Sequence, residues 1–94
     1  MNAEALPISS PIGLIAGGGV LPFAVADKLV ARGIAPVVFA LKGVCDAAPL
    51  SRFRHYWISI GQYGRLTRLL RSENCRDLVF IGTLVRPSFS EIRP

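Results

Sequence analysis

The chain has 94 residues, 51% of them hydrophobic and 18% charged, which is enough apolar material for one small domain with its own core. Its formal net charge of +5 and its pI near 10.0 favour anionic partners such as phosphates, anionic lipid or nucleic acid. No run of about eighteen apolar residues is present and the first ten residues carry no Lys or Arg, so we exclude a membrane span and a signal peptide and expect a soluble cytoplasmic protein.

The first segment, residues 1–11, contains Pro7, Ser9 and Pro11 and has no regular hydrophobic period. Such a segment is typical of a frayed tail. We therefore place the folded domain at residues 12–94.

Three consecutive glycines follow the first apolar run, residues 12–16, and Pro22 follows the glycines. Glycine admits backbone angles closed to other residues and proline suits the first helical turn, so this pattern predicts a buried strand, a tight loop and a helix start. Backbone N–H groups that converge at a helix N-terminus favour phosphate or another anion. We expect this loop to contact a phosphate or a nucleotide. The alternative is a loop that only turns the chain.

Two common nucleotide-binding motifs are disfavoured. A dinucleotide fingerprint counted from Gly17 has Pro22 where its third glycine should stand, and no acidic residue for a ribose follows the next apolar run, which ends near Lys42. A phosphate-binding lysine loop is absent because no Gly-Lys-Ser/Thr sequence follows the glycines. An ordinary NAD site is therefore not expected.

The next elements continue the alternation of strand and helix. Residues 22–32 carry apolar side chains at helical spacing and end at Gly33, while the continuous apolar run 36–41 predicts a strand that is covered on both faces. Residues 42–54 are polar and irregular, and we expect a loop there with room for a short helical turn.

The second half of the chain repeats this alternation. The aromatic-rich residues 55–60 alternate and predict a third strand, and residues 63–74 predict a second helix. Residues 78–81 predict a fourth buried strand, after which residues 83–94 are expected to leave the sheet.

This order predicts an α/β fold, a three-layer Rossmann-like domain with a mostly parallel sheet of about four strands and two main helices. In an open parallel sheet the carboxyl ends of the strands lie on one edge, where ligands bind. We expect these residues at that edge: Gly17, Gly18, Gly19, Lys42, Gly61, Gln62, Thr83 and Arg86.

The expected edge offers glycines, a hydroxyl and cations, but no carboxylate or His placed to act as a base or nucleophile. His55 is expected at the opposite end of its strand, in a structural role. Cys45 and Cys75 lack metal-ligand spacing, and we expect both to be buried thiols. We therefore predict no catalytic and no metal-ligating residue in this chain.

The second predicted helix carries a stripe of arginines, Arg65, Arg68 and Arg71, which we interpret as a solvated face rather than a contact with an acidic partner. A nucleic-acid role is disfavoured because the aromatic side chains fall inside predicted strands and not on an exposed stacking face. These aromatic residues are Phe39, Tyr56, Trp57 and Phe80.

Three separated segments together resemble one family. They are residues 12–19 followed by Leu21 and Pro22, then Gly61-x-x-Gly64-Arg65 with Leu69, Leu70 and Arg71, and finally Gly82-x-x-x-Arg86-Pro87-x-Phe89. In their order and spacing they resemble the N-terminal domain of LpxI-type UDP-2,3-diacylglucosamine diphosphatases. The similarity runs from about Ile12 to Pro94 and covers only the first part of such an enzyme.

The resemblance implies hydrolysis of the pyrophosphate bond of UDP-2,3-diacylglucosamine, in which water attacks the α-phosphorus and releases UMP and lipid X in lipid A biosynthesis. It implies Mg²⁺ and a catalytic aspartate in a C-terminal domain missing from this chain, so that the fragment alone would be inactive. The implied partners are UDP-2,3-diacylglucosamine or lipid X and that missing domain, with contact to the inner-membrane surface left open and no nucleic acid.

The resemblance also implies a set of substrate-binding residues. Family members often carry an amide residue or a lysine where this chain has Thr83. The implied set is Gly17, Gly18, Gly19, Leu21, Pro22, Gly61, Gln62, Thr83 and Arg86. The residues by themselves leave a second hypothesis open, a free-standing nucleotide- or phosphate-binding regulatory module, because the βαβ pattern comes without catalytic groups.

Overall fold

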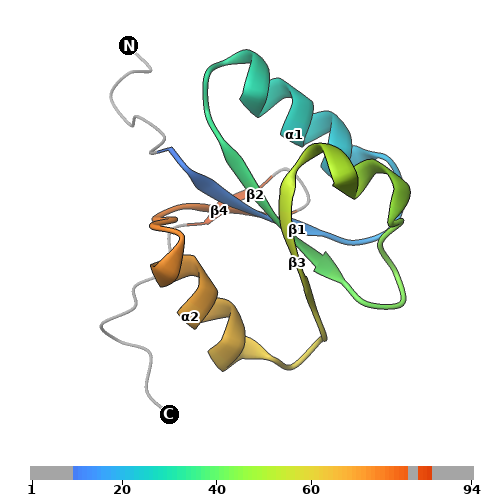
Figure 1. Ribbon diagram of the computed structural model, residues 1–94, viewed down its shortest axis with the longest axis vertical. Helices are drawn as coiled ribbons and strands as arrows, with labels where there is room; N and C mark the ends of the chain where they lie inside the picture. The colour runs from blue at the N-terminus through green and yellow to red at the C-terminus, as the bar shows by residue number, and fades with distance from the viewer. Residues whose placement is uncertain (1–9, 81–82, 86–94) are drawn as a thin grey trace.

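The computed structural model describes residues 10–80 and 83–85 (Figure 1). All six predicted elements are present, and each begins within one residue of its predicted start. Among the described residues, no helix has the length and apolar character needed to span a membrane. The elements in chain order are β1 (Ile12–Ala16), α1 (Leu21–Ala31), β2 (Pro36–Leu41), the 3₁₀ helix η2 (Ala48–Arg52), β3 (Arg54–Ile58), α2 (Tyr63–Ser72), β4 (Leu78–Phe80) and β5 (Thr83–Val85).

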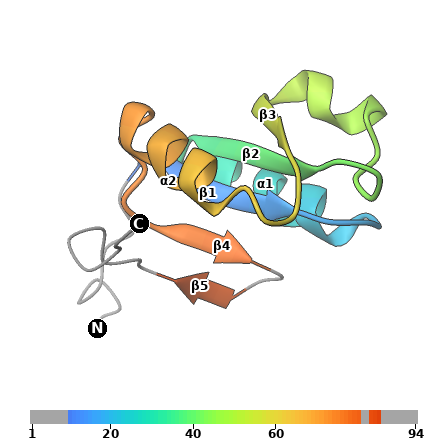
Figure 2. The same cartoon turned by 90° about the horizontal axis from the view of Figure 1, so that it is seen from below.

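The five strands form one sheet in the order β3-β2-β1-β4-β5. The first four strands in this order are parallel, and β5 runs antiparallel to β4 with Thr83 opposite Phe80 (Figure 2). The predicted mostly parallel α/β sheet is confirmed. The expectation that the chain leaves the sheet at Thr83 is wrong, because Thr83–Val85 pairs with the outer edge of β4, which would otherwise leave backbone groups without partners.

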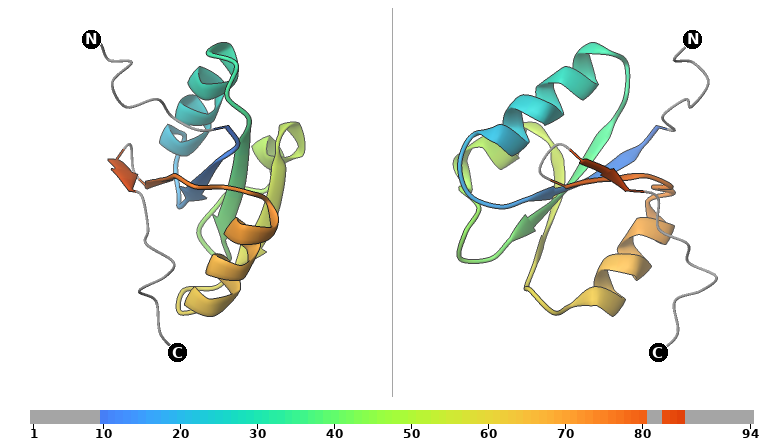
Figure 3. Two further views of the ribbon diagram at one scale, coloured as in Figure 1. Left: turned by 90° about the vertical axis from the view of Figure 1, so that its left-hand side faces the viewer. Right: turned by 180° about the vertical axis from the view of Figure 1, so that it is seen from behind.

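The helices cover opposite faces of the sheet, which gives the three predicted layers (Figures 1 and 3). Successive side chains of a strand point to opposite faces, so β1 contributes to both cores. One core joins β1 to α1 and contains Ile12, Leu14, Ala16, Phe23, Ala26 and Leu29 among its buried residues. The other joins β2 and β3 to α2 and contains Val37, Phe39, Ile58, Leu70 and Cys75. Both cysteines are buried and free, as predicted.

Two elements end two residues earlier than predicted, and the first is β3, which ends at Ile58 instead of Ile60. Helix α2 ends at Ser72, two residues early, because Asn74 adopts a left-handed backbone conformation with φ of 60°. The arginine stripe on α2 is also less uniform than expected. Arg68 is exposed, whereas Arg65 is half-buried and its Nη1 donates a hydrogen bond to the backbone carbonyl of Trp57 in β3.

Gly13 allows α2 to lie close to the middle of the sheet. A Cβ atom placed on Gly13 would lie 2.7 Å from Leu70 Cδ2, 3.0 Å from Leu78 Cδ1 and 3.2 Å from Phe39 Cε2. These distances are shorter than normal carbon contacts, so a side chain here would push three packed side chains aside. The absence of a Cβ at Gly13 therefore sets the depth at which α2 packs.

We predict that Gly13→Ala lowers the free energy of unfolding by about 1–3 kcal/mol, the usual cost of overpacking a core. Gly64→Ala in α2 is the matched control, because a Cβ there meets nothing within 4 Å. The control should be neutral or should gain about 0.5–1 kcal/mol, because alanine favours the helix. Urea unfolding of both variants measures the difference. Equal stability of the two variants would refute the packing argument.

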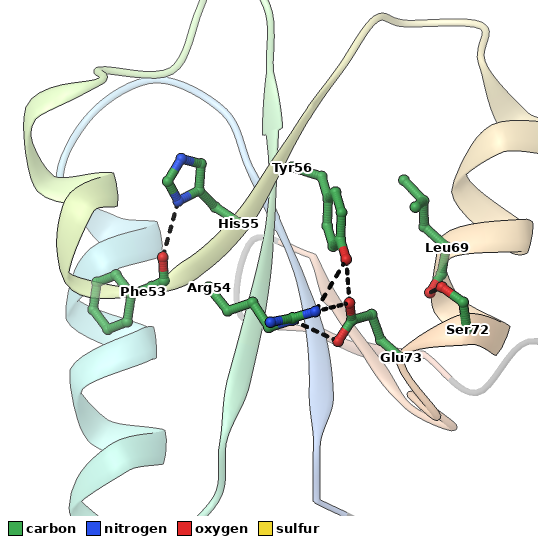
Figure 4. A network of polar contacts seen from close by, with 7 residues as sticks. All are labelled: Phe53, Arg54, His55, Tyr56, Leu69, Ser72 and Glu73. Atoms are coloured by element: carbon green, nitrogen blue, oxygen red, sulfur yellow. Dashed lines mark hydrogen bonds and ion pairs between the residues drawn. The ribbon is translucent and has the colours of Figure 1, made fainter.

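A polar network joins the start of β3 to the end of α2 (Figure 4). Arg54 donates from Nε to Glu73 Oε1 and from Nη2 to Glu73 Oε2, both at 2.8 Å, and the Tyr56 hydroxyl donates to Oε2 as well. The hydrogen bonds from Arg54 and then Tyr56 hold the pKa of the Glu73 carboxyl below its usual value. The same carboxylate raises the pKa of Tyr56. The network lies at the amino edge of the sheet.

The lowered pKa of Glu73 makes this network sensitive to acid. The unfolded chain takes up the proton near pH 4.5, before the folded chain does, so the contribution to stability is present above pH 4.5 and is lost as pH falls through the lowered folded-state pKa. We predict that Glu73→Gln lowers the melting temperature at neutral pH, and that its difference from the wild type shrinks in acid. Thermal melts from about pH 7 to about pH 3 test this, and a difference that does not change with pH would contradict it.

Candidate functional site

The loops that follow β1, β2 and β3 meet at the carboxyl edge of the sheet, the edge predicted to bind ligand (Figure 1). This edge carries most of the exposed large apolar side chains of the described residues. The exception is Val30 on α1, and the rest are Val20, Leu21, Val44, Ile60, Tyr63 and Phe80. Phe80 was expected inside its strand but is 44% exposed, because it is the last residue of β4. A gathering of exposed apolar side chains of this kind marks a binding surface.

The glycine loop connects β1 to α1 by backbone alone. Only Gly19 of the three glycines has a left-handed backbone, with φ of 83°. Val20 precedes the helix, and its carbonyl accepts hydrogen bonds from Phe23 N–H and Ala24 N–H, both at 3.1 Å. The N–H groups of Gly18, Gly19 and Leu21 donate to none of the residues that the structure describes. The first turn of α1 carries no acidic residue, so the positive end of the helix is open to an anion.

A small hollow of about 250 Å³ lies beside this loop. Gly18 forms part of its wall, and a Cβ on Gly18 would lie 3.3 Å from Val44 Cγ1. A Cβ on Gly17 would meet nothing within 4 Å. The small hollow is lined by Ile15, Gly17, Gly18, Leu21, Pro22, Leu41 and Phe80.

A large hollow of about 420 Å³ lies between the strand ends and the first turns of α2. It shares Ile15, Leu41 and Phe80 with the small hollow, so the two adjoin. Its remaining wall is formed by Ile58, Ser59, Ile60, Gly61, Gln62, Tyr63, Leu66 and Leu78. Backbone donors and an apolar hollow therefore lie next to each other along one edge.

Six of the expected site residues line one of the two hollows. Gly17, Gly18, Leu21 and Pro22 line the small hollow, and Gly61 and Gln62 line the large one. Gly19 belongs to the same loop but lines neither hollow, and Lys42 is exposed directly after β2. Thr83 opens β5 opposite Phe80, and Arg86 lies outside the described residues. Contact of any of these residues with a ligand stays a prediction.

The side chain of Gln62 already has a partner within the protein. Its Oε1 accepts a hydrogen bond from the backbone N–H of Ser59 at 2.7 Å. This bond closes the turn between β3 and α2, so the amide oxygen of Gln62 is engaged before any ligand arrives. Gln62 therefore has a structural role in this turn, and its contact with a ligand stays a prediction.

The described residues bring together no group of three His, Cys, Asp or Glu side chains that could hold a metal ion. His55 lies at the amino end of β3, where its Nδ1 is 2.9 Å from the carbonyl oxygen of Phe53. Burial raises the pKa of the Cys75 thiol to about 11, and the nearby Glu73 adds to the shift. A thiol with this pKa is not a nucleophile near neutral pH.

Sequence reasoning missed the apolar character of the site. The residues expected at the edge were glycines, cations and a hydroxyl, yet most side chains that line the large hollow are aliphatic or aromatic. A signal for it was present in the sequence. Ile60 and Tyr63 flank the pair Gly61-Gln62, and Leu66 follows about one helical turn after Tyr63, so apolar residues surround an expected ligand loop.

Comparisons with known proteins were consistent with each other. The family model described as the LpxI N-terminal domain matches residues 11–94. A curated protein of Caulobacter vibrioides, named UDP-2,3-diacylglucosamine pyrophosphatase LpxI, is 39% identical over 83 residues, which make up 88% of this chain and 29% of the relative. The chain thus spans less than a third of the length of the curated relative that it matches.

Proposed function

The chain belongs to the LpxI family, whose N-terminal domain it matches, and on this basis we propose that it is the substrate-holding part of a UDP-2,3-diacylglucosamine pyrophosphate hydrolase. In the proposed reaction water attacks the α-phosphorus, the pyrophosphate bond breaks, and UMP and lipid X leave. The hydrolytic groups belong to the rest of the protein, and this part binds and orients the substrate.

One observation carries the proposal, namely that the glycine loop and the large hollow adjoin at one edge. A diacylated sugar nucleotide has phosphates and apolar chains in the same molecule. Backbone N–H groups at the start of α1 suit the phosphate, because they donate hydrogen bonds at the positive end of a helix dipole. The aliphatic walls of the large hollow suit an acyl chain, because each buried methylene leaves water.

The proposed role of this part is binding and orientation. Pro22 carries no N–H, so the anion would be met by the loop N–H groups and not by the second residue of α1. A substrate that is held by its phosphate at the glycine loop and by an acyl chain in the large hollow has a fixed orientation along this edge of the sheet.

The resemblance also calls for Mg²⁺, and the described residues do not fit that ion. They provide no cluster of carboxylate, imidazole or thiolate groups. A divalent cation that binds a diphosphate prefers carboxylate oxygens. We therefore assign no step through the metal to this chain, and its ligands would come from elsewhere in the full-length protein.

We predict that Gly17→Val in the full-length protein lowers kcat/KM for UMP release by about tenfold or more, which corresponds to about 1.4 kcal/mol of lost transition-state binding. Gly17 has an ordinary backbone conformation, and a Cβ there meets nothing within 4 Å, so the folded structure accepts the side chain. The added isopropyl group would instead occupy the space through which a phosphate approaches the loop. This makes Gly17 a cleaner test than Gly18, where Val44 is in contact.

The assay uses UDP-2,3-diacylglucosamine and magnesium, and melting temperatures establish that the variants are folded. Arg68→Ala, on the exposed side of α2, is the control and should retain activity. A wild-type full-length protein that releases no UMP refutes the proposed function. A folded Gly17→Val protein with full activity shows that the loop only turns the chain.

A further inference from the structure

Two hydrogen bonds fix the turn between β3 and α2, residues 59–62. The Ser59 N–H donates to Gln62 Oε1 at 2.7 Å, and the Gln62 N–H donates back to the Ser59 carbonyl at 3.1 Å. Gly61 has φ of 98°, a conformation that closes the turn and that other residues rarely adopt. Both ends of the turn are thus tied together by the backbone and side chain of one residue, Gln62.

This fixed turn holds an aliphatic side chain away from the core. Ile60 is 82% exposed, more than any other large apolar side chain of the described residues, and it lines the large hollow. An isoleucine that faces water gives up the stabilisation it would gain from burial. The turn is therefore arranged to present Ile60 at the mouth of the hollow rather than to bury it.

We propose that Ile60 determines acyl-chain selectivity by closing over a chain that leaves the large hollow, and that Gln62 is the positioning residue that holds Ile60 there. The inference rests on the proposed function and adds a residue whose contact with the substrate depends on the length of the acyl chain. A short chain ends inside the hollow and does not reach Ile60. A longer chain passes beneath the isoleucine side chain, and each further buried methylene contributes roughly fourfold to binding.

The test is a competition in one tube between two forms of UDP-2,3-diacylglucosamine, with shorter and longer acyl chains, hydrolysed by the full-length protein with magnesium. Mass spectrometry of the two lipid products gives the ratio of the kcat/KM values, independent of the amount of active enzyme. Ile60→Ser should lower the preference for the longer chain by about tenfold, the loss of one to two methylene contacts. Val30→Ser, which removes an aliphatic side chain that is 54% exposed on α1, is the matched control and should leave the ratio unchanged.

Gln62 is tested by a pair of variants with similar size. Gln62→Leu lacks the acceptor for the Ser59 N–H and should reduce the selectivity in the same direction as Ile60→Ser. Gln62→Glu keeps an acceptor oxygen at that position and should therefore keep the wild-type selectivity. A purely structural role of Gln62 would lower melting temperature and total activity without changing the product ratio.

The outcomes separate the inference from the proposed function. No UMP release by the wild type refutes the proposed function, and the inference with it. An active Ile60→Ser protein with an unchanged product ratio refutes the inference alone. An equal loss for both substrates would assign Ile60 to contact with the rest of the protein. A loss of Ile60→Ser activity that is seen only with substrate in vesicles, and not in detergent, would assign Ile60 to contact with a lipid surface. Both of these results also overturn the inference.

Discussion

The close approach of α2 to β1 at Gly13 is the constraint on which the candidate site depends. Leu70 can lie over β1 only because Gly13 has no side chain, since a Cβ there would come within 2.7 Å of the leucine. The depth of α2 fixes where its first turns stand relative to the strand ends. Tyr63 and Leu66 therefore form one wall of the large hollow and Ile15 forms another. Gly13, a buried residue of β1, thus shapes a surface feature several residues away.

The main elements of the fold were predictable because hydrophobic period, glycine and proline all agreed. The run from Pro36 to Leu41 is apolar without interruption, and in the structure every residue of it except Leu41 is buried, as expected for a strand covered on both faces. Strand β5 was not predictable in this way. It has only three residues and depends on the free edge of β4, a partner that no local pattern reveals.

The candidate site was predictable in position but not in chemistry. The topology places the loops after parallel strands on one edge, so Gly17, Gly18, Gly61 and Gln62 came together as expected. Residue type alone could not tell that Gln62 would bond to its own turn, because that depends on the backbone of Gly61. The sequence does place apolar residues on either side of Gly61, but it could not tell that Ile60 and Leu66 would face a hollow, since apolar residues in such positions are more often core.

The hydrogen bond from Arg65 to Trp57 has a consequence for how the molecule behaves in concentrated solution. Strand β3 is an outer strand of the sheet, and because the Ile58 carbonyl accepts from Lys42 N–H on the β2 side, the Trp57 carbonyl points outward. The guanidinium of Arg65 donates a hydrogen bond to that carbonyl, so a strand from a neighbouring molecule would have to displace a charged group before it could pair there. Addition of a further strand at β3 is therefore disfavoured at Trp57, because pairing there would break this hydrogen bond.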